Sequence, residues 1–327
     1  MEYTEIGALK KVSRVGLGTW AIGGWMWGGT EEQESIDTIH AALNNGINLI
    51  DTAPVYGFGR SEEIVGKALA QGNYRERTVL ATKVGLNWDD GKVFRDSRPQ
   101  RIVEEVEDSL RRLQTDVIDL YQVHWPDPLV PIEDTAAALL KLKESGKIRA
   151  IGVSNYSPEQ IKTFEGVTAL DSNQPPYNLF ERGIEEDVLP TCKEHDVALI
   201  TYGALCRGLL SGKMSTEREF VGDDLRQHDP KFKAPRFAEY LQAVERLEQI
   251  AQRHGRSVLH LAVRWVLDMG SNVALWGARN PHQLDPVAQV DGWNLDARTL
   301  KEIDTILQEE ITDPVGPEFM APPARKE

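Results

Sequence analysis

The sequence has 327 residues, with 37 Lys and Arg against 51 Asp and Glu, which gives a formal net charge of −14. Hydrophobic residues make up 41% of the chain, enough to bury a sizeable core and to exclude wholesale disorder. The acidic balance argues against nucleic acid or an anionic membrane as a partner, because phosphate binding needs clustered Lys and Arg. No apolar run approaches the roughly 18 residues of a membrane span. The N-terminus also lacks a secretory signal, so we expect a cytoplasmic protein.

Neither a disulfide framework nor a metal site is expected. Cys192 and Cys206 are the only cysteines, too few for a disulfide scaffold and badly spaced for zinc. The seven histidines show no pair at close ligand spacing, and His260 falls on a predicted helix, where a structural role is expected. Metal-dependent hydrolysis is therefore disfavoured.

Short β-rich runs alternate along the chain with amphipathic segments of helical period. The predicted strands are 15–20, 48–53, 78–82, 117–124, 148–153, 171–174, 198–202 and 272–275. The predicted helices between them include 31–45, 98–113, 131–145, 157–166, 185–195 and 237–255. Ser157-Pro158 places a capping residue before a proline at a helix start, and Gly46, Gly146 and Gly255 stand where helices should end.

Eight such units without a flexible linker predict a (β/α)8 TIM barrel that forms a single domain over residues 1–327. An N-terminal β-hairpin over 3–12, with Gly7-Ala8 at its turn, could plug the barrel floor. We expect a long loop over 206–235 and an extra C-terminal helix over 296–310 before a Pro-rich tail. A doubly wound open sheet is the alternative, because it also alternates strands and helices.

One glycine motif bears on that alternative. Gly16-Leu-Gly18-Thr-Trp-Ala21 fits the G-x-G-x-x-A pattern of a dinucleotide-binding turn. That pattern requires a helix to open at once, whereas the chain continues through the glycine-rich stretch 23–29. We therefore interpret it as a tight strand end followed by a flexible loop.

Polar residues stand at the ends of three consecutive predicted strands. Asp51 ends the second strand and is followed by Tyr56, Lys83 ends the third, and His124 ends the fourth. Each alone could be a capping, surface or packing residue. Because the carboxyl ends of barrel strands meet at one mouth, together they predict a single active site.

These residues lie in motifs that resemble a known family. Asp51-Thr-Ala-Pro-Val-Tyr-Gly57 with Ser61-Glu62, Ala81-Thr-Lys83, Asp119-Leu-Tyr-Gln-Val-His-Trp125 and Gly152-Val-Ser-Asn-Tyr156 resemble the aldo-keto reductase superfamily. The similarity runs from about Val15 to Arg279 and is greatest to bacterial NADPH-dependent general reductases. These also resemble the β-subunits of voltage-gated potassium channels.

The resemblance implies reduction of aldehydes and ketones to alcohols, in a reversible reaction. Tyr56 would be the general acid, Lys83 and Asp51 its tuning pair, and His124 the residue that orients the carbonyl. A phenol has a pKa of about 10, and a neighbouring ammonium is expected to lower it. Donors from Tyr56 and His124 would stabilise the negative charge that develops on the carbonyl oxygen.

The resemblance also implies a nicotinamide cofactor, NADPH by preference with NADH possible. Ser154, Asn155 and Gln174 match carboxamide-binding positions, Tyr202 matches the aromatic that stacks on the nicotinamide, and Arg279 could pair with a 2′-phosphate. The segments 205–213 and 277–283 resemble the pyrophosphate loop and the adenosine site. The expected cofactor residues are Thr19, Trp20, Asp51, Ser154, Asn155, Gln174, Tyr202, Gly203, Leu205, Arg207, Gly208, Lys213, Gly277, Arg279 and Gln283.

Two stretches depart from the family pattern. Gly203-Ala204 replaces the usual Ser-Pro, and Trp276 replaces the usual proline before Gly277, so we expect an altered seat for the cofactor.

Tryptophans gather where the mouth of the barrel is expected and predict an apolar pocket for small carbonyl compounds of broad range. The expected substrate-pocket residues are Trp25, Trp27, Tyr56, Trp88, His124 and Trp125. The alternative function is a cofactor-loaded barrel that senses redox state or docks on a partner, like the channel β-subunits. Monomer and homo-oligomer both stay open.

Overall fold

A computed structural model describes residues 1–326 as a closed barrel of eight parallel strands. The barrel strands are β3 (Val15–Gly18), β4 (Leu49–Asp51), β5 (Val79–Val84), β8 (Ile118–Val123), β9 (Ile148–Ser154), β10 (Ser172–Gln174), β11 (Ala198–Thr201) and β12 (Val273–Gly277). The ring closes where β12 pairs with β3. All eight predicted strands are confirmed, and the open doubly wound sheet is wrong.

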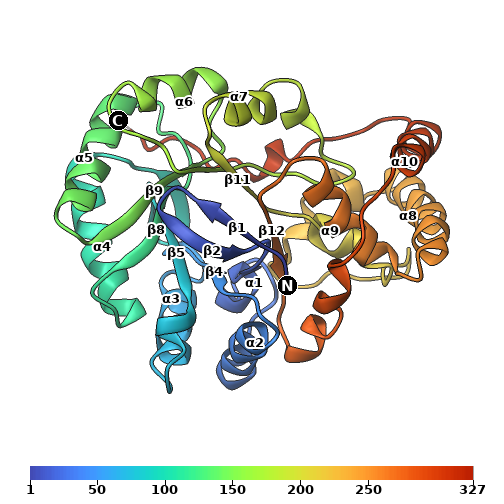
Figure 1. Ribbon diagram of the computed structural model, residues 1–327, viewed down its shortest axis with the longest axis horizontal. Helices are drawn as coiled ribbons and strands as arrows, with labels where there is room; N and C mark the ends of the chain where they lie inside the picture. Colours follow the sequence, from blue (N-terminus) through green and yellow to red (C-terminus); the bar gives the residue numbers. More distant parts are fainter. Residues whose placement is uncertain (327) are drawn as a thin grey trace.

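The outer layer consists of helices that follow the strands (Figure 1). They are α1 (Trp20–Gly23), α2 (Glu32–Asn44), α3 (Arg60–Leu69), α4 (Pro99–Leu113), α5 (Ile132–Glu144), α6 (Pro158–Glu165), α7 (Val188–Glu194), α8 (Arg236–Arg253), α9 (Val258–Asp268) and α10 (Ala297–Glu310). Ser157 and Gln160 form a reciprocal capping box at the start of α6, as the Ser-Pro signal indicated. None of the helices within 1–326 has the length and apolar character of a bilayer crossing.

The eighth βα unit departs from the regular pattern. After β12 the chain forms two 3₁₀ turns, Pro281–Leu284 and Val287–Val290, which contact α2 and α9 and fill the place of a barrel helix. Pro281 and Pro286 each lack a backbone donor, which disfavours one long helix here. The predicted extra helix is confirmed as α10, which packs against α8 outside the ring (Figure 1).

The predicted N-terminal hairpin is also confirmed. Strands β1 (Tyr3–Ile6) and β2 (Leu9–Ser13) are antiparallel and lie across the centre of the ring in Figure 1. Ile6, Leu9 and Val12 are buried against side chains of the barrel interior. The hairpin therefore closes the floor of the barrel.

A second hairpin follows β5 and was not predicted. It consists of β6 (Leu86–Asp89) and β7 (Lys92–Arg95), joined by Asp90 and Gly91, which both have positive φ. An Asp-Gly pair between alternating residues is a strong hairpin signal, so the sequence did contain it. The long loop 206–235 is confirmed as irregular chain with short 3₁₀ turns.

The glycine motif at residues 16–21 belongs to the barrel. Gly16 and Gly18 lie in β3, and the short helix α1 ends after four residues at Gly23. A dinucleotide-binding turn of the open-sheet type is therefore wrong for this motif.

Candidate active site

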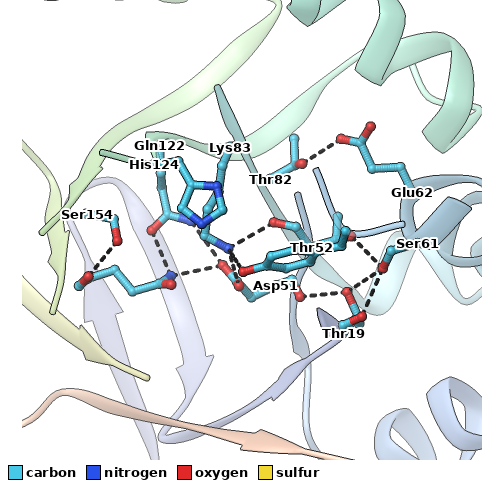
Figure 2. A network of polar contacts seen from close by, with 12 residues as sticks. Thr19, Asp51, Thr52, Ser61, Glu62, Thr82, Lys83, Gln122, His124 and Ser154 are labelled. Carbon is cyan, nitrogen blue, oxygen red and sulfur yellow. Dashed lines mark hydrogen bonds and ion pairs between the residues drawn. The ribbon is translucent and has the colours of Figure 1, made fainter. Parts of the chain in front are cut away.

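Four polar side chains from three consecutive strand ends meet at the mouth of the barrel, as predicted. The Lys83 ammonium donates to Oδ2 of Asp51 at 2.5 Å, to the Thr52 carbonyl at 3.0 Å and to the phenolic oxygen of Tyr56 at 3.1 Å. Figure 2 shows Lys83 among these oxygens. The His124 ring stands edge-on to the Tyr56 ring, with 5.7 Å between their centroids. A phenol, a charged ammonium and an imidazole ring thus share one site.

Burial determines the protonation of this group. It opposes the charge on Lys83, but Asp51 and Tyr56 outweigh that effect, so the pKa of Lys83 lies above its ordinary value. Burial also disfavours the phenolate, and although Lys83 counteracts it, the pKa of Tyr56 is raised. Lys83 thus lowers the pKa of Tyr56 as expected, but burial and the Asp51 charge outweigh it. Tyr56 keeps its proton at neutral pH, as a proton donor must.

His124 is held in its neutral form. Burial and the nearby Lys83 charge both hold the pKa of His124 well below its ordinary value. A neutral imidazole still carries one N–H donor. It can therefore orient a carbonyl oxygen without competing with Tyr56 as an acid.

Gln122 is a site residue that sequence analysis missed. It is fully buried on β8, and its amide nitrogen donates to Oδ1 of Asp51 at 3.0 Å. Gln174 donates to the same oxygen at 2.9 Å. Gln122 lies two residues before His124, so strand periodicity could have placed both on the inner face.

A second polar cluster holds the loops behind the site. The Ser61 hydroxyl lies 2.9 Å from the hydroxyls of both Thr19 and Thr52, and Thr19 donates to the Asp51 carbonyl at 2.9 Å. Figure 2 shows this cluster beside the Lys83 group. Thr19 is thus fully buried behind the site, as a support for Asp51.

Close backbone packing fixes the loop that carries Tyr56. A Cβ added at Gly23 would lie 2.6 Å from the Tyr56 backbone, and one added at Gly57 would lie 2.2 Å from the Gly23 carbonyl oxygen. Gly57 also has a positive φ of 67°. Only glycine at both positions allows the loops after β3 and β4 to approach this closely.

A cavity of about 680 Å³ opens over these side chains. The predicted residues that line it are Thr19, Trp20, Trp25, Trp27, Asp51, Tyr56, His124, Trp125, Ser154, Asn155, Gln174, Tyr202, Gly203, Leu205, Arg207, Gly208, Lys213, Gly277, Arg279 and Gln283. Lys83 lies buried beneath Tyr56, outside the lining.

Trp88 was expected in the pocket but does not line it. It lies on β6 of the hairpin that was not predicted, and its ring packs against Phe58. Phe58 in turn packs against Trp25. Trp88 therefore supports the pocket wall from behind, while Leu86 and Val93 of the same hairpin face the cavity.

The expected carboxamide-binding residues are connected to one another. The Ser154 hydroxyl donates to the backbone carbonyl of Gln174 at 2.6 Å, and the side-chain amide of Asn155 donates to the backbone carbonyl of His124 at 3.0 Å. Asn155 also accepts a 2.9 Å hydrogen bond from the Tyr202 hydroxyl. These bonds fix the direction of each group before any ligand arrives.

The expected pyrophosphate loop has one surprising member. The guanidinium of Arg207 is buried between Asp229, at 2.5 Å, and Glu181. Lys231 also pairs with Glu181, at 2.8 Å. The charge of Arg207 is therefore neutralised inside the protein, whereas Lys213 on the same loop is exposed at the cavity.

Arg279 lines the cavity from the turn that follows β12. Arg279 donates to the Gly29 carbonyl at 2.9 Å, and its backbone N–H donates to the Gln283 side chain at 2.7 Å. Trp276 is buried, and its indole N–H donates to the Gln283 carbonyl at 3.2 Å. The unusual tryptophan thus supports the turn that carries Arg279 from beneath.

The C-terminal segment, which was not predicted as part of the site, forms another wall of the cavity. Residues 319–323 line it, and Arg95 donates to the carbonyls of Pro322, at 2.8 Å, and Pro126, at 3.0 Å. Arg325 pairs with Asp127 at 2.5 Å. In Figure 1 this red segment runs from α10 to the opposite side of the barrel. Its Pro-rich sequence has no periodic pattern that could have indicated this path.

The donor set fits a nicotinamide dinucleotide. Amides, a hydroxyl and an aromatic ring line the cavity with Tyr56, and the exposed cations Lys213 and Arg218 line it as well, together with Arg279. Amides suit an amide-bearing ring, and cations suit phosphates. Within 1–326, no cluster of three His, Cys, Asp or Glu side chains is placed to hold a metal ion.

The model of the aldo/keto reductase family matches residues 14–308. The chain belongs to this family. Its members are oxidoreductases that act on carbonyl compounds with nicotinamide cofactors. The resemblance inferred from the strand-end motifs is therefore confirmed.

Several relatives cover almost the whole chain. Aldo-keto reductase YhdN of Bacillus subtilis is 61% identical over 330 residues, which is 100% of both chains. The NADH-specific methylglyoxal reductase of Escherichia coli is 36% identical and spans 91% of this chain and 96% of its own.

Solved structures agree with the fold. A glycerol dehydrogenase from Gluconobacter oxydans has a TM-score of 0.89 and 54% identity, with 98% of each chain covered. An aldo/keto reductase from Klebsiella pneumoniae, solved with NADP and acetate, has a TM-score of 0.71 and 28% identity, with 93% of this chain and 94% of its own covered.

Proposed function

We propose that the chain reduces small aldehydes and ketones to alcohols with NADPH, and catalyses the reverse oxidation, with Tyr56 as the proton donor. The observation that carries the proposal is the position of Lys83, buried between Asp51 and the phenol at the mouth of the cavity. An intact set of Asp51, Tyr56, Lys83 and His124 supports catalysis over a purely sensing role. The cytoplasmic location stays a prediction.

The side chains supply proton transfer and charge stabilisation. Tyr56 is protonated and donates its proton to the carbonyl oxygen, while His124 offers a neutral N–H to the same oxygen. Lys83 stays charged because Asp51 pairs with it, so it stabilises the phenolate left on Tyr56. When bound, the nicotinamide supplies the hydride.

Arg279 supports NADPH over NADH. Arg279 lines the cavity, and its guanidinium makes one hydrogen bond to a backbone carbonyl, which leaves other N–H groups for a 2′-phosphate. The relatives differ: one is named as NADH-specific, and another was solved with NADP. The proposal therefore depends on this chain's own Arg279.

The pocket beside Tyr56 supports small uncharged substrates. Trp25, Trp27 and Trp125 line it together with the apolar segment 319–323, and Arg226 at its edge is already paired with Asp224 at 2.6 Å. Two relatives are named for methylglyoxal and for glycerol. Small carbonyl compounds of this size are the substrates that we propose, with no fixed anion clamp.

The test follows NADPH oxidation by its nicotinamide absorbance, with 4-nitrobenzaldehyde or methylglyoxal as substrate. We expect turnover by the wild type and a loss of at least about 100-fold in Tyr56→Phe, with NADPH binding retained in a fluorescence titration. Tyr74→Phe, which removes a hydroxyl on the outer surface, is the control and should behave as wild type. A wild type that binds NADPH but turns over neither substrate would favour a sensing barrel instead.

A further inference from the structure

Gln122 connects the expected carboxamide-binding residues to the polar group around Lys83. Its amide nitrogen donates to Oδ1 of Asp51 at 3.0 Å, and its amide oxygen accepts from the Gln174 nitrogen at 3.1 Å. Gln174 donates from the same nitrogen to Asp51 at 2.9 Å. The three side chains therefore form a closed, buried triangle. Figure 2 shows two of its members, Gln122 and Asp51, beside Lys83.

This triangle fixes the orientation of the Gln174 amide. Both acceptors that Gln174 meets, the Asp51 carboxylate and the Gln122 carbonyl, can bind only its NH₂ end. Its Oε1 atom accepts no hydrogen bond from any described residue between 1 and 326, and Gln174 lines the cavity. An acceptor oxygen is thereby left for a ligand that offers an amide N–H.

The same triangle changes the electrostatics of the proton donor. Asp51 receives Lys83 on Oδ2 and two amide N–H groups on Oδ1. The negative charge of Asp51 raises the pKa of Tyr56. Amide dipoles that point at this carboxylate weaken its negative potential, so they favour the phenolate form of Tyr56.

A glycine on the neighbouring strand makes room for Gln122. Gln122 pairs in register with Gly152 of β9, and Gly152 pairs with Ser172 of β10. A Cβ added at Gly152 would lie 2.8 Å from Cγ of Gln122 and 2.6 Å from the Ser172 hydroxyl. The position and rotamer of Gln122 are therefore determined by the barrel wall as well as by its hydrogen bonds.

We propose that Gln122 is a positioning residue that couples the cofactor seat to the proton donor, by orienting the Gln174 amide and by sharing the charge of Asp51. The inference rests on the proposed function, because it assigns roles to Gln174 and Tyr56. Gln122 itself touches neither substrate nor cofactor. Loss of this one amide should therefore change cofactor affinity and proton transfer together.

Within residues 1–326, four titratable side chains lie around Tyr56. Lys83 faces it from β5, Asp51 from β4, His124 from the end of β8 and Tyr202 from the end of β11. Gln122 and Gln174 add no titratable group from β8 and β10. A change at Gln122 consequently acts on Tyr56 through Asp51.

The experiment compares Gln122→Leu with a matched control, Leu120→Met, which lies two residues earlier on the same strand and in the apolar floor. NADP⁺ and NADPH dissociation constants are measured by fluorescence, without turnover. The pH profile of kcat is then measured for oxidation of 4-nitrobenzyl alcohol, a step in which Tyr56 must first be deprotonated. Gly152→Ala is a second variant that displaces Gln122 without removing its amide.

We expect Gln122→Leu to weaken cofactor binding by about 3- to 10-fold. Because Asp51 then carries more unshielded charge, the Tyr56 pKa rises, and the acid limb of alcohol oxidation moves to higher pH by about half a unit or more. Gly152→Ala should shift both quantities in the same direction, and Leu120→Met neither.

Four outcomes separate the possibilities. The inference would be overturned if Gln122→Leu folds and has the same cofactor dissociation constants and the same acid limb of kcat as Leu120→Met. Gln122 would then merely fill space. A change in only one of the two quantities would overturn the coupling. If Gln122→Leu does not fold, Gly152→Ala decides by the same criteria. A wild type without turnover would instead contradict the proposed function.

Discussion

The guanidinium of Arg207 donates a 2.5 Å hydrogen bond to the buried carboxylate of Asp229. Arg207 lies at the start of the long loop 206–235 and Asp229 lies near its end, so this pair joins two parts of the same loop. Lys231 extends it by a 3.2 Å hydrogen bond to the carbonyl of Gly316, near the C-terminus. Arg207, which the sequence indicates as a phosphate ligand, thus belongs to a buried ion-pair network that joins distant segments of the chain.

Asp229→Ala should lower the free energy of unfolding by about 3–5 kcal/mol, because it leaves a buried guanidinium with one carboxylate fewer. Chemical denaturation with an unchanged m value would measure this loss. Lys213→Gln, on the same loop but exposed, should leave stability unchanged and raise the KM for NADPH. If Lys213→Gln lowers the stability and Asp229→Ala changes only the KM for NADPH, the structural role of Arg207 is contradicted.

Lys83→Met should reduce carbonyl reduction by at least about 100-fold, because Tyr56 loses the charge that stabilises its phenolate. The variant should also be less stable by about 3–5 kcal/mol, since Asp51 stays buried without its cation. The double variant Asp51→Asn, Lys83→Met should recover part of the stability and none of the activity. Recovered activity in the double variant would contradict the role of Lys83.

His124 should make stability depend on pH in a defined direction. The pKa of His124 is lowered in the folded state, whereas in the unfolded chain it is about 6.5. At pH values between these two pKa values, the unfolded chain therefore binds more protons at His124 than the folded chain does. The free energy of unfolding should therefore fall as the pH drops below about 6.5, by at most about 1.4 kcal/mol per pH unit from this group.

Denaturation of wild type and His124→Gln at pH 8, 7, 6 and 5 isolates this effect. The variant should lose less stability on acidification than the wild type. His282→Gln changes a histidine side chain that is 91% exposed and should follow the wild type. Parallel curves for wild type and His124→Gln would show that His124 is not held neutral.

Arg279→Gln should raise the KM for NADPH about tenfold and leave the KM for NADH almost unchanged, because only NADPH offers a 2′-phosphate. Steady-state kinetics with both cofactors would measure this. Arg298→Gln, an exposed change on α10, controls for the loss of one positive charge. Equal increases for NADPH and NADH would place Arg279 elsewhere on the cofactor.

The sequence was most informative where local pattern and position agree. The strands could be predicted from short β-rich runs, and Asp51, Lys83 and His124 could be placed because parallel strands end at one mouth. The predicted hairpin at residues 3–12 followed from its Gly-containing turn. These features depend on short stretches of chain.

The remaining features depend on partners that are distant in sequence. Arg207 was expected to bind the cofactor's phosphates. Its actual partners, Glu181 and Asp229, are 26 and 22 residues away in the sequence, and no local pattern indicates that they pair with it. Trp88 was expected to line the substrate pocket because the hairpin of β6 and β7, which carries it, was not predicted. The net pKa shift of Tyr56 depends on burial, which only the packed site reveals.

The floor hairpin has a consequence for how the chain is made. Residues 3–13 are synthesised before the barrel strands, yet the wall that they pack against is complete only after Val273 and Leu275 of β12 have been synthesised. This early segment is therefore covered only late in synthesis, and a fragment that stops before β12 still exposes the apolar side of the hairpin to water.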